Sequence, residues 1–182
     1  MKLNKKYYSI FLMFFMFSCS FYSLNKSIPL HLNNVVLQPT INKTNEYKIG
    51  REFENKFLQL LLEKNLLSIT DYEKADCQLR FTIEKLNDVP YLLDDSKNAT
   101  TVKQWQIEIV IHMEWFDLVN QSELTNKPIV ESVVYSLNNS SIINDNNQNS
   151  DGIEFATNRE AAIEQCIINL SDRMINELTS TW

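Results

Sequence analysis

The chain has 182 residues and a formal net charge of −6, with only two glycines, two histidines and three cysteines. This charge argues against nucleic-acid binding, because affinity for phosphate depends on lysine and arginine. Two glycines cannot build a glycine-rich phosphate loop, and so few histidines and cysteines predict neither a metal site nor a cofactor.

The first 18 residues predict a secretory signal peptide. Three lysines precede the apolar run Tyr7–Phe17, which is about half as long as a membrane-spanning helix. Ser18-Cys19 then resembles the cleavage box of bacterial lipoproteins, with Cys19 as the lipid-bearing residue. Acyl chains on Cys19 are expected to hold the mature chain on a membrane. The alternative is an ordinary signal peptide cut nearby, with Cys19 as a bystander.

After a tether at residues 19–33, the sequence predicts a strand followed by a helix. Asn34–Gln38 is rich in β-branched residues and is closed by Pro39. From Glu46 to Lys64 the apolar residues recur at helical spacing, and Asn65 is expected to end this helix. The helical stripe consists of Ile49, Phe53, Phe57, Leu60 and Leu61.

Three runs that alternate apolar and polar residues predict further strands. They cover residues 77–84, 104–115 and 129–137. The longest run places Trp105 and Trp115 on an apolar face and leaves the opposite face polar. The polar stretch Asp94–Asn98 is expected to form a turn between the first two runs, and residues 138–156 a mobile loop.

The chain ends in a second predicted helix. Thr157-Asn158-Arg159-Glu160 fits a capping box, so we expect the helix to start at Thr157 and to run to Trp182. The order of elements predicts one α+β domain, residues 34–182. In it, two helices pack on one face of a roughly four-stranded mixed or antiparallel sheet.

No catalytic motif occurs in the sequence, so we expect a protein that is not an enzyme. His112 and Glu114 share the polar face of the longest strand, where an acid–base pair is geometrically allowed. A solvated strand face explains both residues more simply, although a dispersed catalytic site stays open.

Polar and basic side chains around the longest strand are the candidates for contact with a partner. They are Gln104, Gln106, Glu108 and His112 on its polar face, with Lys97 and Lys103 near the preceding turn. Cys77 and Cys166 both fall on apolar faces. An oxidising compartment permits a disulfide between them, and two buried free thiols fit the pattern equally well.

Four stretches carry a resemblance to a known family. They are Cys19–Leu24 with Ser27-Ile28-Pro29 and the strand 34–37; Phe53, Phe57 and Leu61; Ala75–Leu79; and Asn158–Ala162 continuing to Trp182. In this order and spacing they resemble the LptE-type lipopolysaccharide-assembly lipoproteins, in particular their divergent Bacteroidetes-like branch.

The resemblance implies a lipoprotein on the periplasmic side of the outer membrane. Such proteins plug a β-barrel that inserts lipopolysaccharide into the outer leaflet, and Ser20 after Cys19 is consistent with sorting to that membrane. Because a barrel lumen is polar, we expect the polar face of residues 104–114 and the loops 92–101 and 138–152 to approach the barrel. The family's basic lipopolysaccharide contacts have no match here, so direct lipopolysaccharide binding stays open.

A second class of function is compatible with the same features. A non-catalytic scaffolding or regulatory lipoprotein of the envelope, for instance a regulator of a cell-wall synthase, would also be anchored through Cys19 and would show a similar strand–helix layout.

Overall fold

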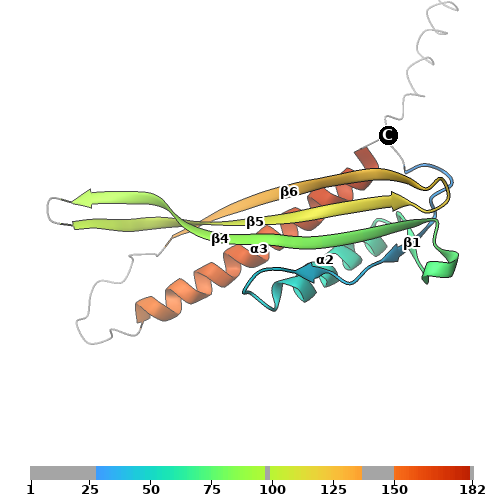
Figure 1. Cartoon of the computed structure of the whole chain (residues 1–182). Coiled ribbons are helices and arrows are strands. Elements are labelled where there is room, and N and C mark those ends of the chain that lie inside the picture. The colour runs from blue at the N-terminus through green and yellow to red at the C-terminus, as the bar shows by residue number, and fades with distance from the viewer. Residues whose placement is uncertain (1–27, 97–98, 137–149, 181–182) are drawn as a thin grey trace, which may run out of the picture.

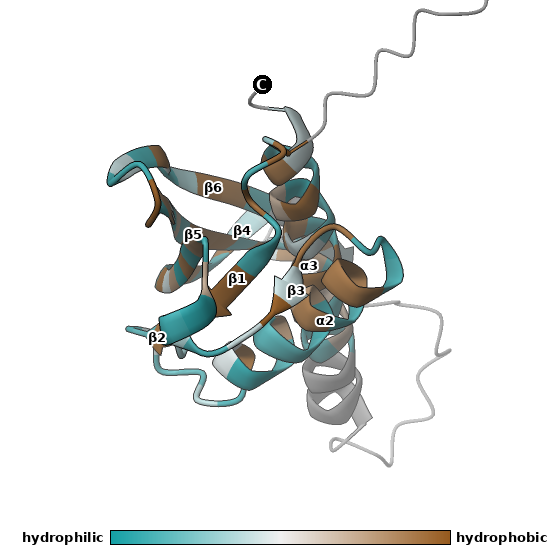
Figure 2. Ribbon diagram, turned by 90° about the vertical axis from the view of Figure 1, so that its right-hand side faces the viewer, coloured by the Kyte–Doolittle hydropathy of each residue, from teal (hydrophilic) through white to brown (hydrophobic). Residues whose placement is uncertain are grey.

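The computed structural model describes residues 28–96, 99–136 and 150–180. One mixed sheet carries both long helices on the same face (Figures 1 and 2), so the predicted α+β architecture is confirmed. The elements are β1 (Asn34–Leu37), β2 (Ile41–Asn42), α2 (Ile49–Glu63), β3 (Ser68–Ile69), a short 3-10 helix (Tyr72–Lys74), β4 (Cys77–Ser96), β5 (Ala99–Asp117), β6 (Ser122–Ser136) and α3 (Ser150–Ser180).

The strands run in the order β3-β1-β4-β5-β6, and β2 pairs with β4. β1, β2 and β3 make parallel pairs, whereas β4, β5 and β6 form an antiparallel meander. The sheet therefore has six strands where about four were predicted. The two extra strands, β2 and β3, are two residues long and are too short to show any periodicity.

The core lies between the helices and the inner face of the sheet. The alternating apolar residues from Cys77 to Ile83 of β4 and from Ile107 to Trp115 of β5 are fully buried there, as predicted, and Trp105 is partly buried. Phe81 of β4 meets Phe53 and Phe57 of α2 edge-on, with ring centroids 5.1 and 4.7 Å apart. The predicted stripe of α3 covers the rest of this face: Ile163, Cys166, Ile167, Leu170, Met174 and Leu178.

α2 ends where the sequence predicted. Asn65 follows the last turn with a positive φ of 47°. Its N–H donates to the carbonyl of Leu62, and the N–H of Leu66 donates to the carbonyl of Leu61. These two bonds form a Schellman motif, which satisfies two of the carbonyls that a helix leaves without partners at its end.

α3 starts earlier than predicted. Its first residue is Ser150, so the capping box at Thr157 lies inside the helix and the predicted start is wrong. A capping box is a local preference, and propagation of a long helix that packs on a sheet overrides it. Of the predicted mobile loop 138–156, residues 150–156 belong to α3 and the rest lies outside the described residues.

The β4–β5 ribbon is the longest feature of the fold. β4 continues to Ser96, so Asp94–Ser96 of the predicted turn belong to a strand. β5 has 19 residues, which corresponds to roughly 60 Å of strand. In Figure 1 the ribbon extends past α2 and β6, away from β1. Within residues 28–96, 99–136 and 150–180, neither helix has the length and apolar character that crossing a membrane requires.

Candidate functional site

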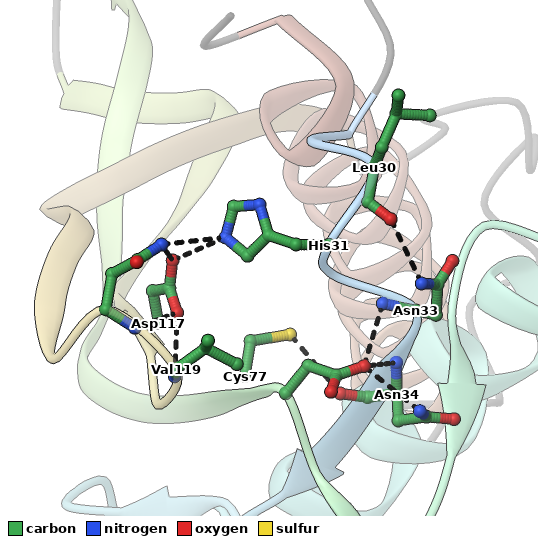
Figure 3. Close-up of polar contacts among 9 residues, drawn as sticks. Leu30, His31, Asn33, Asn34, Cys77, Asp117 and Val119 are labelled. Carbon is green, nitrogen blue, oxygen red and sulfur yellow. Dashed lines mark hydrogen bonds and ion pairs between the residues drawn. The ribbon is translucent and has the colours of Figure 1, made fainter.

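The domain begins before residue 34. Leu32 is only 2% exposed and Ile28 packs against the core, so residues 28–33 belong to the fold and not to the predicted tether. Two carboxylates at this end of the sheet, Asp76 and Asp117, hold the segment in place (Figure 3 shows Asp117 beside His31).

Asp117 closes the β5–β6 turn. Its Oδ1 accepts hydrogen bonds from the backbone N–H groups of Val119 and Asn120, both 2.9 Å long. Its Oδ2 accepts from His31 Nε2 at 2.7 Å and from Asn120 Nδ2 at 2.9 Å. Burial alone would raise the pKa of Asp117, but these hydrogen bonds outweigh it and lower the pKa to about 2.

Asp76 precedes β4 and binds the backbone at the start of β1. Its Oδ2 accepts from the N–H groups of Asn33 and Asn34, at 3.0 and 2.8 Å, and from Asn34 Nδ2 at 3.0 Å. Burial raises the pKa of Asp76, but the hydrogen bonds from Asn34 and Asn33 together lower it by more, so the net shift is downward. The entry of the chain into the domain is therefore fixed to the sheet.

The polar face of β5 lies on the side of the sheet opposite the helices. Gln104, Gln106, Glu108 and His112 share this face, because the residues between them point into the core. Glu108 accepts a hydrogen bond from Asn87 Nδ2 on β4 at 3.1 Å, and His112 Nε2 lies 2.5 Å from Asn126 Oδ1 on β6. The predicted common face is confirmed, and its role in binding stays a prediction.

The other two predicted contact residues, Lys97 and Lys103, were expected near the turn before β5 and not on its polar face. Lys103 sits at a register shift, because Leu92 pairs with Gln104 and Leu93 with Val102. Lys97 lies outside the described residues, as does the predicted lipid site Cys19.

His112 and Glu114 do not form an acid–base pair. Glu114 Oε2 accepts from Arg80 Nη1 at 3.2 Å, while His112 contacts Asn126. Both side chains thus belong to cross-strand pairs on the outer face of the sheet.

The disulfide alternative for Cys77 and Cys166 is wrong, because both are free thiols. Cys77 pairs with Asp117 at one end of β5, while Cys166 Sγ lies 3.8 Å from the carbonyl oxygen of Ile107. Ten residues of strand separate these positions, or roughly 33 Å. A disulfide needs Cα atoms within about 7 Å.

A polar cluster at the root of the ribbon was not predicted. Asp88 of β4 accepts from Tyr135 Oη at 2.9 Å and from Arg159 Nε at 2.7 Å, and Arg159 also pairs with Glu46 at 2.8 Å. These bonds join β4, β6, α3 and the segment before α2.

A bulge places Asp88 on the inner face. Ile83 pairs with Ile111 and Lys85 with Val110, so Glu84 is the extra residue, and the side chains of β4 from Lys85 to Pro90 change face. The sequence held one signal for this change, since Glu84 and Lys85 are two successive charged residues in an alternating run.

No protein-family model matches the sequence, and no curated protein matches it either. Solved structures match in fold. Rare lipoprotein B from Shewanella oneidensis is 17% identical with a TM-score of 0.57, and the match covers 82% of this chain and 96% of that one.

Two further structures match over similar shares of both chains. Lipoprotein B from Nitrosomonas europaea is 10% identical with a TM-score of 0.57, over 88% of this chain and 90% of that one. A protein from Xanthomonas campestris is 9% identical with a TM-score of 0.52, over 84% and 86%. At these identities the likeness shows the fold alone. This chain has the fold of the rare lipoprotein B-like lipoproteins, whereas its membership of a Bacteroidetes-like branch stays a prediction.

Proposed function

We propose that this chain is a lipoprotein of the outer membrane, anchored on the periplasmic side by acyl chains on Cys19. Its domain plugs the lumen of a β-barrel and so supports the insertion of lipopolysaccharide into the outer leaflet. The shared fold with rare lipoprotein B, over 96% of that chain, carries the proposal. The lipoprotein box at Ser18-Cys19 supports the anchor.

The shape of the domain supports a plug. His31, close behind the proposed tether, is bonded to Asp117 at one end of β5, and the other end of this strand lies roughly 60 Å away. A whole bilayer with its headgroups is about 45 Å thick. A domain held at its tethered end is therefore long enough to extend through a barrel from one membrane surface to the other.

The chemistry of the sheet supports the same role. Gln104, Gln106 and Glu108 offer amide and carboxylate groups on the face that no helix covers, and these groups suit a polar lumen. In this proposal the protein acts by occupying the lumen. His112 and Glu114 are each bonded to other partners, so they supply no acid–base pair.

The test is purification of the full, tagged chain from membranes in mild detergent, followed by mass spectrometry of the proteins that travel with it. A large outer-membrane barrel in about equal amounts is expected. Cell-wall enzymes in its place, or no barrel at all, would overturn the plug and favour a scaffolding lipoprotein. As a control, Cys19→Ser should lower the share of the chain in the membrane fraction, while the barrel, which spans the membrane by itself, stays there.

A further inference from the structure

Large apolar side chains are exposed at the end of the domain where the chain enters. Leu30 is 95% exposed, Tyr72 60% and Val119 59%. They belong to three segments, which are the turn before β1, the 3-10 helix and the β5–β6 turn. We call these three residues the tether-end patch. Single exposed apolar residues are normal on a protein surface, but three on loops at one end of a domain indicate a contact site.

Hydrogen bonds hold the three segments together. The carboxylate of Asp117 accepts from His31, the residue after Leu30, at 2.7 Å, and from the N–H of Val119 at 2.9 Å. The carbonyl of Asp76, just past the 3-10 helix, accepts from the N–H of the residue before Val119 at 2.9 Å. All three segments lie at one end of the sheet in Figure 1, and in Figure 3 the Leu30 side chain points away from Asp117.

The backbone of these loops is suited to a region of low polarity, because its N–H groups bond within the domain. The N–H groups of Val119 and Asn120 both donate to Asp117 Oδ1 at 2.9 Å. The N–H of Leu32 donates to the carbonyl of Pro29, also at 2.9 Å. A backbone group without a partner would be costly near hydrocarbon, and these three groups avoid that cost.

The charges around the patch argue against attraction to an anionic surface. Asp71, Glu73 and Lys74 flank Tyr72, and Glu123 follows the β5–β6 turn, all of them exposed. Acidic side chains thus outnumber basic ones here, and the whole chain has a formal net charge of −6. Anionic lipids attract clusters of lysine and arginine, so this patch suits a phospholipid surface without net charge.

The proposed lipid anchor lies close to the patch along the chain. Leu30 is 11 residues after Cys19, so their Cα atoms are at most roughly 40 Å apart. An anchor this near makes a second membrane contact intramolecular, and a weak contact then suffices. In the proposed plug this end lies at the periplasmic mouth of the barrel, where the tether has to pass to the surrounding lipid.

We infer that the tether-end patch inserts into the headgroup region of the leaflet that holds the acyl chains of Cys19, and that zwitterionic phospholipid is its partner. The inference rests on the anchor of the proposed function and does not require the plug. Leu30 and Val119 supply aliphatic side chains, and the Tyr72 ring with its hydroxyl suits the boundary between lipid and water. Such a contact fixes the orientation of the domain at the membrane, which a single-point anchor does not.

The first experiment measures how close single positions lie to lipid. The full chain with its acyl chains is reconstituted in vesicles of phosphatidylethanolamine and phosphatidylcholine, some of which carry a nitroxide. A fluorescent probe is attached to Val119→Cys or, as a control, to Leu92→Cys near the far end of β4. We expect at least about threefold stronger quenching at position 119 than at position 92. Equal quenching at the two positions would overturn the inference.

The second experiment keeps the probe at position 119 and removes the rest of the patch. Leu30→Thr/Tyr72→Thr should reduce the quenching at least about threefold. Leu93→Thr/Tyr91→Thr is the matched control, because it removes the same two residue types at the other end of the ribbon, where both are more than half exposed. It should change the quenching less than about 1.5-fold. Equal losses in the two variants would contradict a contact at the patch.

The lipid composition tests the nature of the contact. Replacing about a third of the lipid with anionic phosphatidylglycerol, or adding about 0.5 M salt, should leave the quenching at position 119 unchanged. Quenching that requires the anionic lipid would overturn the assignment to a zwitterionic surface. In intact cells, a photo-reactive residue at position 119 should cross-link to phospholipid. Cross-links to protein alone would overturn the inference and identify the patch as a protein contact.

The outcomes separate the inference from the proposed function. If mass spectrometry finds no acyl chains on Cys19 of the purified protein, the proposed anchor fails. If Cys19 is acylated and position 119 is quenched no more than position 92, only the inference fails. Should the Leu30/Tyr72 variant not fold, as judged by its thermal unfolding, the comparison of positions 119 and 92 decides.

Discussion

Asp117 accepts a 2.7 Å hydrogen bond from His31 Nε2, although 86 residues separate the two in sequence. The same carboxylate binds the N–H groups of Val119 and Asn120 and is 1% exposed. One side chain therefore closes the β5–β6 turn and also fixes the segment by which the chain enters the domain.

Asp117→Asn is expected to lower the free energy of unfolding by on the order of 2 kcal/mol at pH 7. The pKa of Asp117 is lowered from its ordinary value of 3.8 to about 2 in the folded chain. The carboxylate therefore stabilises the fold above pH 4, and this contribution is lost as the pH falls through 2. Urea unfolding of both proteins between pH 7 and pH 2 should show the two stabilities converging at the acid end.

Asp172→Asn is the matched control, because Asp172 is half exposed and lies 3.7 Å from Lys64. Its effect should stay below about 1 kcal/mol at every pH. A stability difference between wild type and Asp117→Asn that did not change with pH would show that the charge of Asp117 is not what stabilises the fold.

Asp88 and Arg159 should be energetically coupled. Each is less than a quarter exposed, and removing one leaves the other partly buried without its main partner. In a double-mutant cycle of Asp88→Asn and Arg159→Met, we expect a coupling free energy of about 1–3 kcal/mol, measured by urea unfolding.

The exposed pair Lys43–Glu84 provides the comparison for this cycle. Its Nζ–Oε1 distance of 2.9 Å is similar, but both side chains are about a third exposed or more. The coupling of Lys43→Met and Glu84→Gln should be below about 0.5 kcal/mol. Equal couplings for the two pairs would mean that burial does not strengthen the Asp88–Arg159 contact.

The sequence predicted the elements with strong periodicity and missed those whose form depends on distant contacts. The buried faces of β5 and α3 follow from alternation and from helical spacing, and both are as expected. β2 forms because β4 offers it an edge at Thr82 and Ile83, and two residues carry no pattern of their own. The inward position of Asp88 was not predicted, because the bulge at Glu84 changes the face on which the next residues of β4 lie.

The same contrast holds for the candidate site. The polar face of Gln104, Gln106 and Glu108 could be predicted, because alternation within one strand decides it. The bond between His31 and Asp117 could not, since it depends on how the chain before β1 docks at the far end of β5. Leu92 and Leu93 are exposed because the β4–β5 ribbon extends past α2, and the local sequence pattern does not predict where the helices end relative to the sheet.

The two thiols should be inert in the folded chain. Burial, with the nearby Asp76 and Asp117 carboxylates, raises the pKa of Cys77 to about 11, against a smaller lowering by the Trp115 side chain. Burial and Glu131 raise the pKa of Cys166 to about 12. In the Cys19→Ser variant at pH 8, a maleimide should label neither thiol while the protein is folded. It should label both once urea unfolds the protein. After oxidation, a protein mass measured without reductant that shows a Cys77–Cys166 disulfide would contradict the separation of roughly 33 Å between these two residues.

The backbone conformation of Asn65 allows a prediction that does not depend on its side-chain contacts. Its φ of 47° lies in the left-handed region, which asparagine tolerates and glycine adopts without strain. Asn65→Ala should therefore lower the free energy of unfolding by about 1 kcal/mol, whereas Asn65→Gly should be neutral or stabilising. Both variants lose the same exposed side chain, so a difference between them isolates the backbone conformation. If alanine and glycine proved equivalent in urea unfolding, the Schellman end of α2 would not be what holds this turn in place.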